Sequence, residues 1–283
     1  MASATDDAPK VCSITRWGGR NGNNLVQLTK CLYYAVKRGY SIVSFPRHHL
    51  LTTTTMTVEP EAGVETATKD VASDFFYAQD LMGLREPCVG RLREIAQRYV
   101  VPILTFTVPS AESSGHTIAV HVRSGDVFGA RPHPSYAQPP LDYYRVAIGD
   151  CRDVIVVYED TANPCVEPLR ALYASQSSSL IEDLTTLCRA HTLVAGFGTF
   201  WLMVFFLSRR LKRVVIPDYA AFMCPTTGDV AVACVPLPGY IRGGEWQNTP
   251  AQRDIMLAYA VPRGTDLVTH HDPRTEARDD VPE

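Results

Sequence analysis

Hydrophobic and polar positions at the start of the chain follow the order strand, turn, helix, strand. The apolar run VCSIT from Val11 leads into the turn WGGRNGNN, and residues 24–38 then carry apolar side chains at the 3.6-residue period of a helix. Gly39 stands where a helix C-terminus favours a left-handed residue, and YSIVSF, ending at Pro46, is the next expected strand. This order predicts neighbouring parallel strands.

The same alternation resumes after residue 115. Strands are expected at 116–122, 153–159, 191–197 and 213–217, and their continuous Val/Ile-rich runs are typical of a parallel sheet covered on both faces. Residues 47–70 hold a TTTT run and few large apolar groups, so we expect an exposed loop there. Helices are expected at 75–83, 89–98, 141–148, 164–174, 181–190, 199–210 and about 249–260, the last with Thr249 as its N-cap.

These elements predict an α/β protein with two Rossmann-like halves. The small polar segment PSAESSG, residues 109–115, has the composition of a connection between domains. We therefore expect an N-terminal domain over residues 1–112, a second domain over 113–245 and a C-terminal helical segment over 246–263. The polar residues 264–283 are expected to form a disordered tail.

Composition narrows the classes of function. The 283 residues are 46% hydrophobic and carry 27 Lys and Arg against 30 Asp and Glu. The basic residues are interpreted as scattered apart from a cluster at 209–213, so no nucleic-acid partner is expected. The acidic start predicts no secretory signal, and the apolar stretch 192–207 is too short for a membrane span, so a soluble cytoplasmic protein is expected. Eight cysteines without zinc-type spacing favour free thiols and no metal site.

Three segments carry candidate chemistry, and each follows a predicted strand, at the sheet edge where α/β proteins bind ligands. Residues 18–24, GGRNGNN, form a tight turn that can approach a ligand. Residues 121–126, HVRSGD, hold Arg123, whose planar guanidinium suits a phosphate, and Asp126, which can orient it or bond a sugar hydroxyl. Residues 195–201, AGFGTFW, open an apolar helix whose first N–H groups suit a diphosphate. Each segment alone has a structural alternative: a plain turn, a surface Arg–Asp pair or an ordinary helix start.

Together the three segments resemble the fucosyltransferases that form α-1,2, α-1,6 and protein O-linked fucose. HVRSGD is similar to their H-x-R-R-x-D motif, and GGRNGNNLVQL is similar to their G-R-x-G-N-Q segment. The acidic helix at 182–188, followed by HTLVAGFGTFW, is similar to their E-D helix and S-T-F helix start. The second arginine of the family motif is Ser124 here, which leaves the transferred sugar open. A looser similarity is to small soluble glycosyltransferases of large algal viruses, which implies a host cytoplasm and sugars such as xylose or rhamnose.

The resemblance implies an inverting, metal-independent glycosyltransferase with two facing Rossmann-like domains, the GT-B architecture. The second domain would bind a GDP- or UDP-linked sugar, the first would bind a glycan acceptor, and no cofactor is implied. The lack of any Asp-x-Asp pair agrees with a reaction without a metal. Arg123 is implied as the ligand of the donor phosphate. The other donor-binding candidates are Gly19, Asn21, Gly22, Asn23, His121, Ser124, Asp126, Tyr158, Asp160, Asp183, Gly198, Thr199 and Phe200.

The general base is the least determined role. One candidate is Asp74, which two following phenylalanines would desolvate; the alternative is an N-cap for the next helix. The others are His48 and His49, with Glu61 behind them, and their alternative is a place in a surface loop.

Two further residues and a second function class stay open. His121 is as well explained by a core position as by a sugar contact, and Trp246 either stacks on an acceptor sugar or anchors the last helix. The missing motif arginine favours a second hypothesis, a non-catalytic module that binds a nucleotide sugar or a glycan. The oligomeric state is not predicted.

Overall fold

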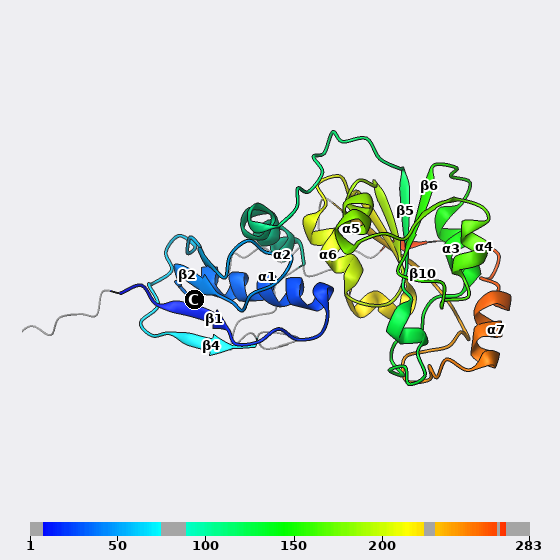
Figure 1. Cartoon of the computed structure of the whole chain (residues 1–283), viewed down its shortest axis with the longest axis horizontal. Coiled ribbons are helices and arrows are strands. Elements are labelled where there is room, and N and C mark those ends of the chain that lie inside the picture. Colours follow the sequence, from blue (N-terminus) through cyan, green and yellow to red (C-terminus); the bar gives the residue numbers. More distant parts are fainter. Residues whose placement is uncertain (1–7, 75–88, 224–229, 265–266, 270–283) are drawn as a thin grey trace, which may run out of the picture. The chain divides into compact units, whose positions relative to one another are not determined.

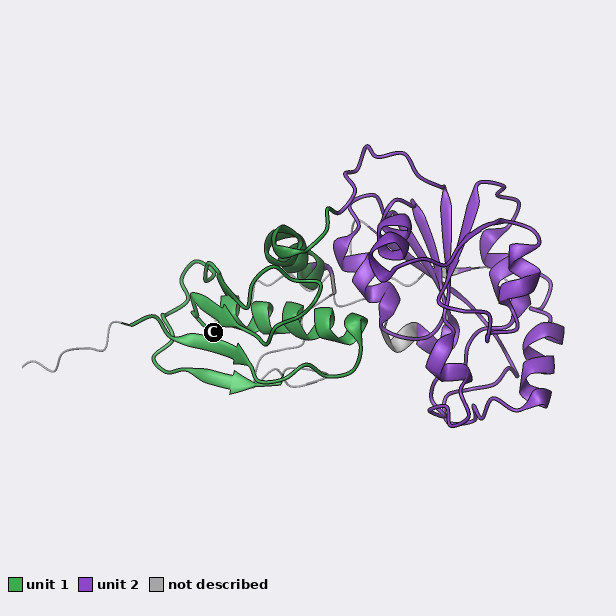
Figure 2. Cartoon of the chain, viewed as in Figure 1, with its two compact units in different colours: residues 1–87, 91–107 green, residues 88–90, 108–283 purple. Residues whose placement is uncertain are grey.

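The structure is a computed structural model that describes residues 8–74, 89–223, 230–264 and 267–269 (Figure 1). It divides into two compact units (Figure 2): unit 1 comprises residues 1–87 and 91–107, and unit 2 comprises residues 88–90 and 108–283. Both units are α/β, as the sequence predicts. The boundary at residues 107 and 108 lies five positions before the one expected at 112.

Unit 1 has a mixed four-stranded sheet in the order β3-β2-β1-β4. β1 pairs in parallel with β2 and β4, and β3 pairs with β2 in the antiparallel sense. The strands are β1 Val11–Ile14, β2 Ile42–Ser44, β3 Thr55–Thr57 and β4 Val71–Ser73. The helices are α1 Asn21–Lys37 and α2 Val89–Ile95, followed by a π-helix Ala96–Val100 and a 3-10 turn Val101–Ile103.

Helix α1 is the main core element of unit 1. It begins at Asn21, three residues before the expected start, and its residues from Asn24 to Val36 are all buried. Gly39, at φ +74°, ends it as predicted: the Tyr40 N–H donates to the Ala35 carbonyl at 3.0 Å, the hydrogen bond of a Schellman motif. A Cβ at Gly39 would lie 1.9 Å from the carbonyl oxygen of Glu65, so this close approach also requires glycine.

Unit 2 has a seven-stranded sheet in the order β11-β10-β9-β8-β5-β6-β7, parallel except for β11. Helices α5 and α6 lie on one side of it, and α3, α4 and α7 lie on the other (Figure 1). The strands are β5 Ile118–Val122, β6 Val154–Tyr158, β7 Ala174–Gln176, β8 Thr192–Ala195, β9 Arg213–Pro217, β10 Ala231–Val235 and β11 Val268–Thr269. The helices are α3 Leu141–Ile148, α4 Val166–Arg170, α5 Leu180–Cys188, α6 Phe200–Leu207 and α7 Pro250–Ala258, with 3-10 turns at Gly125–Phe128 and Asp218–Met223.

The core of unit 2 lies on both faces of the central strands. Val120 and Val194, at the middle of the sheet, are fully buried, and so is nearly all of α6 from Trp201 to Leu207. An eight-residue helix that is apolar on every side suits this enclosed position. Helix α7 starts as predicted, with the Thr249 side chain accepting from the Gln252 N–H and Pro250 in the first turn.

Several expected elements are corrected. The loop expected at 47–70 contains β3. Its β-branched threonines favour a strand, but this short edge strand is exposed and therefore lacks the apolar alternation that would have predicted it. The helix expected at 164–174 ends at Arg170 and is followed by β7, while the helix expected at 199–210 ends at Leu207. β10 and β11 were not expected, and β11 corrects the disordered tail for residues 268 and 269. The helix expected at 75–83 and the tail from residue 270 lie outside the described residues.

The expected domain connection is fixed to unit 2. The guanidinium of Arg210 is buried and donates to the carbonyl oxygens of Ala111, at 3.1 Å, and Ser113. These contacts connect residues 111 and 113 to the segment that follows α6, and both segments belong to unit 2. Within the described parts of the chain, no helix is both long and apolar enough to cross a bilayer.

Candidate functional site

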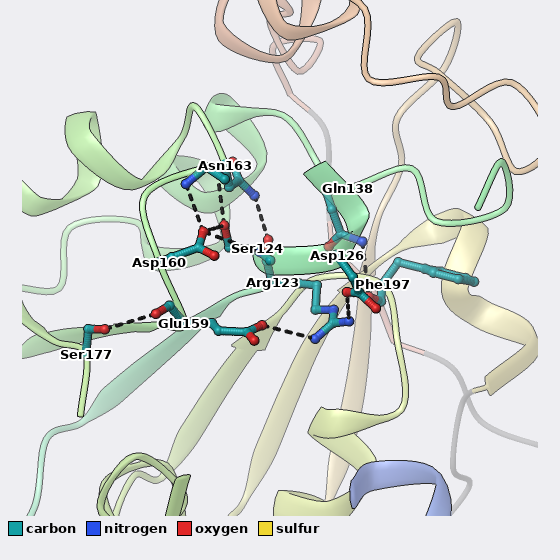
Figure 3. A network of polar contacts seen from close by, with 11 residues as sticks. Arg123, Ser124, Asp126, Gln138, Glu159, Asp160, Asn163, Ser177 and Phe197 are labelled. Carbon is teal, nitrogen blue, oxygen red and sulfur yellow. Dashed lines mark hydrogen bonds and ion pairs between the residues drawn. The ribbon is translucent and has the colours of Figure 1, made fainter. Parts of the chain in front are cut away.

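The carboxyl ends of the central strands of unit 2 bring separate loops together (Figure 3). β5 pairs in parallel with β6, with Val122 opposite Tyr158, and with β8, with His121 opposite Ala195. Residues 123–126, 159–163 and 196–199 therefore leave the same edge of the sheet. This is the place at which ligands bind in open α/β sheets, and it joins two of the three segments singled out in the sequence.

Arg123 lies at the centre of this edge, between two carboxylates. One guanidinium nitrogen donates to Asp126, as predicted, and the other lies 3.5 Å from Glu159, a partner that the sequence did not indicate (Figure 3). The Arg123 side chain is only 17% exposed, so it is held in one orientation and is not a freely solvated surface arginine. Its charge is balanced by carboxylates, and an anionic ligand therefore has to replace or tolerate at least one of them.

A buried polar network holds the turn that carries Arg123. Ser124 is fully buried; its hydroxyl donates to Asp160 and accepts from the Asn163 N–H at 3.0 Å. The Asn163 amide donates to the Arg123 carbonyl at 2.9 Å (Figure 3). Burial alone would raise the pKa of the Asp160 carboxyl, but the hydrogen bonds it accepts and the charge of Arg123 together hold that pKa below its ordinary value. At position 124, therefore, the serine ties β5 to the loop after β6.

Glycines shape both loops at this edge. Gly125 has φ +68°, and a Cβ there would lie 2.6 Å from Glu159 Oε2, so the sharp exit from β5 requires glycine, as expected. A Cβ on Gly196 would lie 2.6 Å from Oε1 of Gln138, a fully buried residue whose amide donates to the Phe197 carbonyl at 3.2 Å. Gln138 thus supports the loop before α6, although nothing in its local sequence singled it out.

The start of α6 contributes an aromatic contact instead of a side-chain cap. Phe200 is the first helical residue, Gly198 adopts φ +134°, and the Thr199 hydroxyl does not cap the helix. The Phe200 ring stacks on His121, with centroids 4.6 Å apart. Burial and then the charge of Arg123 lower the pKa of His121 to about 3, so its imidazole is neutral at physiological pH. His121 therefore packs on the first residue of α6 as a neutral ring.

Three other candidates of unit 2 have structural partners. Asp183 is 8% exposed and accepts from Gln176 Nε2 at 2.9 Å and from the Ser178 N–H at 3.1 Å, so it holds the loop before α5. Tyr158 is buried under the guanidinium of Arg170. Trp246 is 1% exposed, and its Nε1–H donates to the Val127 carbonyl at 2.7 Å. This burial corrects the expectation that Trp246 stacks on a sugar and matches the alternative, an anchor near the last helix.

The carboxyl edge of the unit 1 sheet carries the remaining candidates. The glycine-rich turn before α1 is fixed by buried amides: Gly18 N–H donates to Gln27 Oε1 at 3.0 Å, and Asn24 Nδ2 donates to the Gly18 carbonyl at 2.9 Å. Gly19 has φ +70°, and a Cβ there would lie 2.0 Å from the Asn23 amide. Asn21, Gly22 and Asn23 form the first turn of α1. These four candidates belong to unit 1, whereas Arg123 belongs to unit 2.

His48 is corrected in two respects. It is 7% exposed, so it is not a surface-loop residue. Its Nδ1 accepts from the Leu50 N–H at 3.2 Å, which leaves the proton on Nε2 to donate to Asn24 Oδ1, also at 3.2 Å. Burial, and then His49, lowers the pKa of His48 to about 4. With both nitrogens engaged, His48 is a positioning residue and is not placed to act as a general base.

His49 and Asp74 stay candidates at the same edge. His49 is exposed and stacks on His48, with ring centroids 4.6 Å apart. Asp74 follows β4 and lies 3.4 Å from Arg16. The two phenylalanines after it and the helix expected to follow it lie outside the described residues. Glu61 is corrected: its N–H donates to the Val36 carbonyl near the C-terminal end of α1, and its carboxylate pairs with Lys37 at 2.6 Å, so it does not lie behind the histidines.

A cavity of about 210 Å³ also lies in unit 1, away from the carboxyl edge. It is lined by Val36, Glu61, Arg91 and neighbouring residues, and its charges pair with one another: Arg91 lies 3.0 Å from Glu61 and 2.6 Å from Glu94. Because these charges pair with one another, we assign no ligand to the cavity. Across residues 8–74, 89–223, 230–264 and 267–269, no three His, Cys, Asp or Glu side chains gather as a metal site, and the six cysteines described there are free thiols.

Comparison of the chain with models of known protein families and with curated proteins found no match.

Proposed function

We propose that this chain is an inverting, metal-independent glycosyltransferase of the GT-B type, which moves a sugar from a GDP- or UDP-linked donor to a glycan hydroxyl. The observation that carries the proposal is Arg123, oriented by Asp126 and Glu159 at the carboxyl edge of a parallel sheet and next to the glycine loop that opens α6. The family resemblance of the three segments supports it. The transferred sugar would be either fucose or another sugar such as xylose or rhamnose.

The proposed reaction is a single displacement at the anomeric carbon. The acceptor oxygen forms a bond to that carbon, the bond from the carbon to the diphosphate oxygen breaks, and the acceptor proton passes to a base. Negative charge grows on the leaving diphosphate, where the guanidinium of Arg123 would stabilise it. His49 and Asp74 are the base candidates that the geometry leaves open, because His48 has both ring nitrogens engaged.

The test is the release of nucleoside diphosphate from a panel that includes GDP-fucose, UDP-xylose and UDP-rhamnose, with and without glycan acceptors. Arg123→Gln is expected to lower turnover about a hundredfold, with a smaller effect on acceptor binding, since one donor to a developing oxyanion contributes about 10²–10³ in rate. Arg152→Gln is the matched control, because Arg152 is exposed and precedes β6, at the amino end of the strand. Normal turnover by Arg123→Gln would show that its phosphate role is wrong.

A second candidate function is a binding module without transfer. The engagement of both His48 nitrogens favours it, as does the serine at position 124. The same panel separates the two: a donor that raises the melting temperature but releases no diphosphate with any acceptor indicates the binding module.

A further inference from the structure

The turn that carries Asp126, a partner of Arg123, needs support from outside itself. It is the short 3-10 turn Gly125–Phe128, closed by a hydrogen bond from the Gly129 N–H to the Asp126 carbonyl at 3.2 Å. The last carbonyl groups of a helical segment find no partner within it, and a single isolated turn is unstable in water. Donors from other segments must therefore hold the end of this turn.

Two side chains from the C-terminal segment supply these donors. The Trp246 indole N–H donates to the Val127 carbonyl at 2.7 Å. The Asn248 amide donates to the carbonyls of Phe128, at 2.6 Å, and Gly129, at 3.1 Å. Three successive carbonyl groups at the end of the turn are thus bonded by residues that lie 119 or 120 positions later in the chain.

Arg253, in helix α7, completes the arrangement. Its Nε–H donates to Asn248 Oδ1 at 2.8 Å, and its Nη2 donates to the Phe128 carbonyl at 3.4 Å. The centroid of the buried Phe128 ring lies 5.8 Å from the Arg253 guanidinium and 5.4 Å from the Trp246 ring. We call Trp246, Asn248 and Arg253 the clasp.

The backbone of Asn248 indicates that this contact is specific. Its φ is +56°, and it is the one non-glycine residue with a positive φ in the parts of the chain that the structure describes. Such a conformation is costly for a residue with a Cβ, persists where the surroundings determine it, and is concentrated at functional sites. Here the amide nitrogen donates twice and the amide oxygen accepts once, so the whole side chain is committed to the turn and to Arg253.

The position of the turn affects the guanidinium of Arg123. Asp126 lies within the turn, and its carboxylate accepts from Arg123 (Figure 3). The second carboxylate, that of Glu159, lies 3.5 Å away and comes from the loop after β6. A planar guanidinium between two carboxylates takes its orientation from both of them, so a displaced or mobile turn would release one side of it.

We infer that the clasp residues are positioning residues for Arg123. By bonding the three carbonyl groups they fix the turn, the turn fixes Asp126, and Asp126 orients the guanidinium. Residues 246–263, which the sequence sets apart as a C-terminal helical segment, therefore contribute to the Arg123 site. If the proposed function holds, the clasp also sets the affinity for the donor diphosphate, and the inference rests on that function in this one respect.

The test compares Asn248→Ala and Asn248→Gly with a control in the full chain. Both variants remove the amide, but glycine adopts a φ of +56° without cost, so the pair separates the amide from the backbone conformation. Tyr259→Phe is the control, because it removes the hydrogen bond from the Tyr259 hydroxyl to the Pro238 carbonyl, just beyond the other end of α7. Arg253→Gln is a milder clasp variant, and melting temperatures check that each variant folds.

Two of the measurements need no ligand. NMR with ¹⁵N labelling follows the hydrogen exchange of the Gly129 N–H, which closes the turn. It also follows the rotation of the Arg123 guanidinium about its Cζ–Nε bond, with the signal identified by its loss in Arg123→Gln. The third measurement is calorimetric titration with inorganic pyrophosphate, GDP and UDP.

Both Asn248 variants should exchange the Gly129 N–H and rotate the Arg123 guanidinium about tenfold faster, since two hydrogen bonds are lost and each contributes a few-fold effect. Pyrophosphate should bind these variants about tenfold more weakly for the same reason. Arg253→Gln should change all three values in the same direction by less, and Tyr259→Phe should leave them unchanged.

Four outcomes would overturn the inference. Wild-type values in Asn248→Gly would show that the amide is not needed, and equal changes in Tyr259→Phe would show a general loss of stability. Faster exchange with unchanged rotation of Arg123 would show that the turn does not orient it. Pyrophosphate that binds the wild type and the clasp variants equally would show that the orientation does not matter for an anion.

The ligand-free measurements keep this inference separate from the proposed function. Faster rotation of Arg123 in the clasp variants, with no binding of pyrophosphate, GDP or UDP to the wild type, would support the clasp and contradict the transferase. Nucleotide binding to the wild type, with exchange and rotation unchanged in the clasp variants, would contradict the clasp alone.

Discussion

Replacing Glu159 by glutamine is expected to strengthen the binding of GDP or UDP. The Glu159 carboxylate lies 3.5 Å from the Arg123 guanidinium, and Asp126 accepts a hydrogen bond from another nitrogen of the same group. A phosphate that binds Arg123 therefore comes close to a carboxylate of the same sign. Glutamine keeps the size of the side chain and removes its charge, so it tests this repulsion alone.

The magnitude follows from the geometry. A phosphate oxygen on the far side of the guanidinium would lie about 7 Å from the Glu159 carboxylate, roughly twice the observed separation. Glu159 is 45% exposed, which calls for a high effective dielectric constant. Two unit charges at about 7 Å repel by about 0.6 kcal/mol at a dielectric constant of about 80 and about 1.2 kcal/mol at about 40. Their removal should tighten nucleotide binding about threefold to eightfold.

The assay is calorimetric titration of GDP and UDP into the wild type, Glu159→Gln and Glu112→Gln. Glu112 is an exposed glutamate before β5, so its substitution changes the net charge equally at the amino end of the sheet. The gain should shrink as salt rises, because Glu159 is partly exposed. Weaker binding by Glu159→Gln would refute the repulsion and show that the carboxylate contacts the ligand or is needed to hold Arg123. A gain equal to that of Glu112→Gln would refute the local effect.

Two further predictions concern stability. Ser124→Ala removes the donor to Asp160 and leaves the buried Asn163 N–H without its acceptor. The free energy of unfolding of unit 2 should therefore fall by about 2 kcal/mol, and its melting temperature by about 4–8 °C. Ser135→Ala, at an exposed serine, should change either value little, and equal shifts in the two variants would contradict the network. The pKa of His48 is 6.5 in the unfolded chain and about 4 in the folded chain. As the pH falls from 6.5 towards 4, the unfolded chain therefore binds a proton that the folded chain does not. The free energy of unfolding of unit 1 should fall by up to about 1 kcal/mol per pH unit in this range. Urea titrations followed by ¹⁹F NMR of 5-fluorotryptophan measure the unfolding of unit 1 through Trp17. The dependence of this stability on pH should vanish in His48→Gln and persist in His49→Gln. A pH dependence that persists in His48→Gln would contradict the assignment.

β1 and β2 of unit 1 and the four neighbouring strands β9, β8, β5 and β6 of unit 2 could be predicted because their apolar runs are continuous. β5, β6, β8 and β9 fall inside the expected ranges, and α3 has the expected bounds. β3 and β7 could not be predicted in the same way, since both are edge strands of three residues with exposed side chains. β10 had a usable signal, the run AVACV, which is buried on both faces like its neighbours.

The candidate site shows a similar division between local and long-range information. The pairing of Arg123 with Asp126 follows from a spacing of three residues in a tight turn, and the sequence indicated it. Glu159 approaches Arg123 only because β5 and β6 pair with Val122 opposite Tyr158. Gln138 and the His48–Asn24 pair likewise depend on contacts between distant segments, and hydrophobic periodicity contains no information about such register.

The central claim is that Arg123 binds the diphosphate of a nucleotide sugar. Its most direct measurement is the affinity of GDP and UDP for the wild type, Arg123→Gln and Arg152→Gln by calorimetry. One of the two nucleotides should bind the wild type and Arg152→Gln equally, and Arg123→Gln should weaken that binding about tenfold or more, as expected for the loss of a charge-assisted pair. Equal binding by Arg123→Gln, or no binding of either nucleotide to the wild type, would contradict the account.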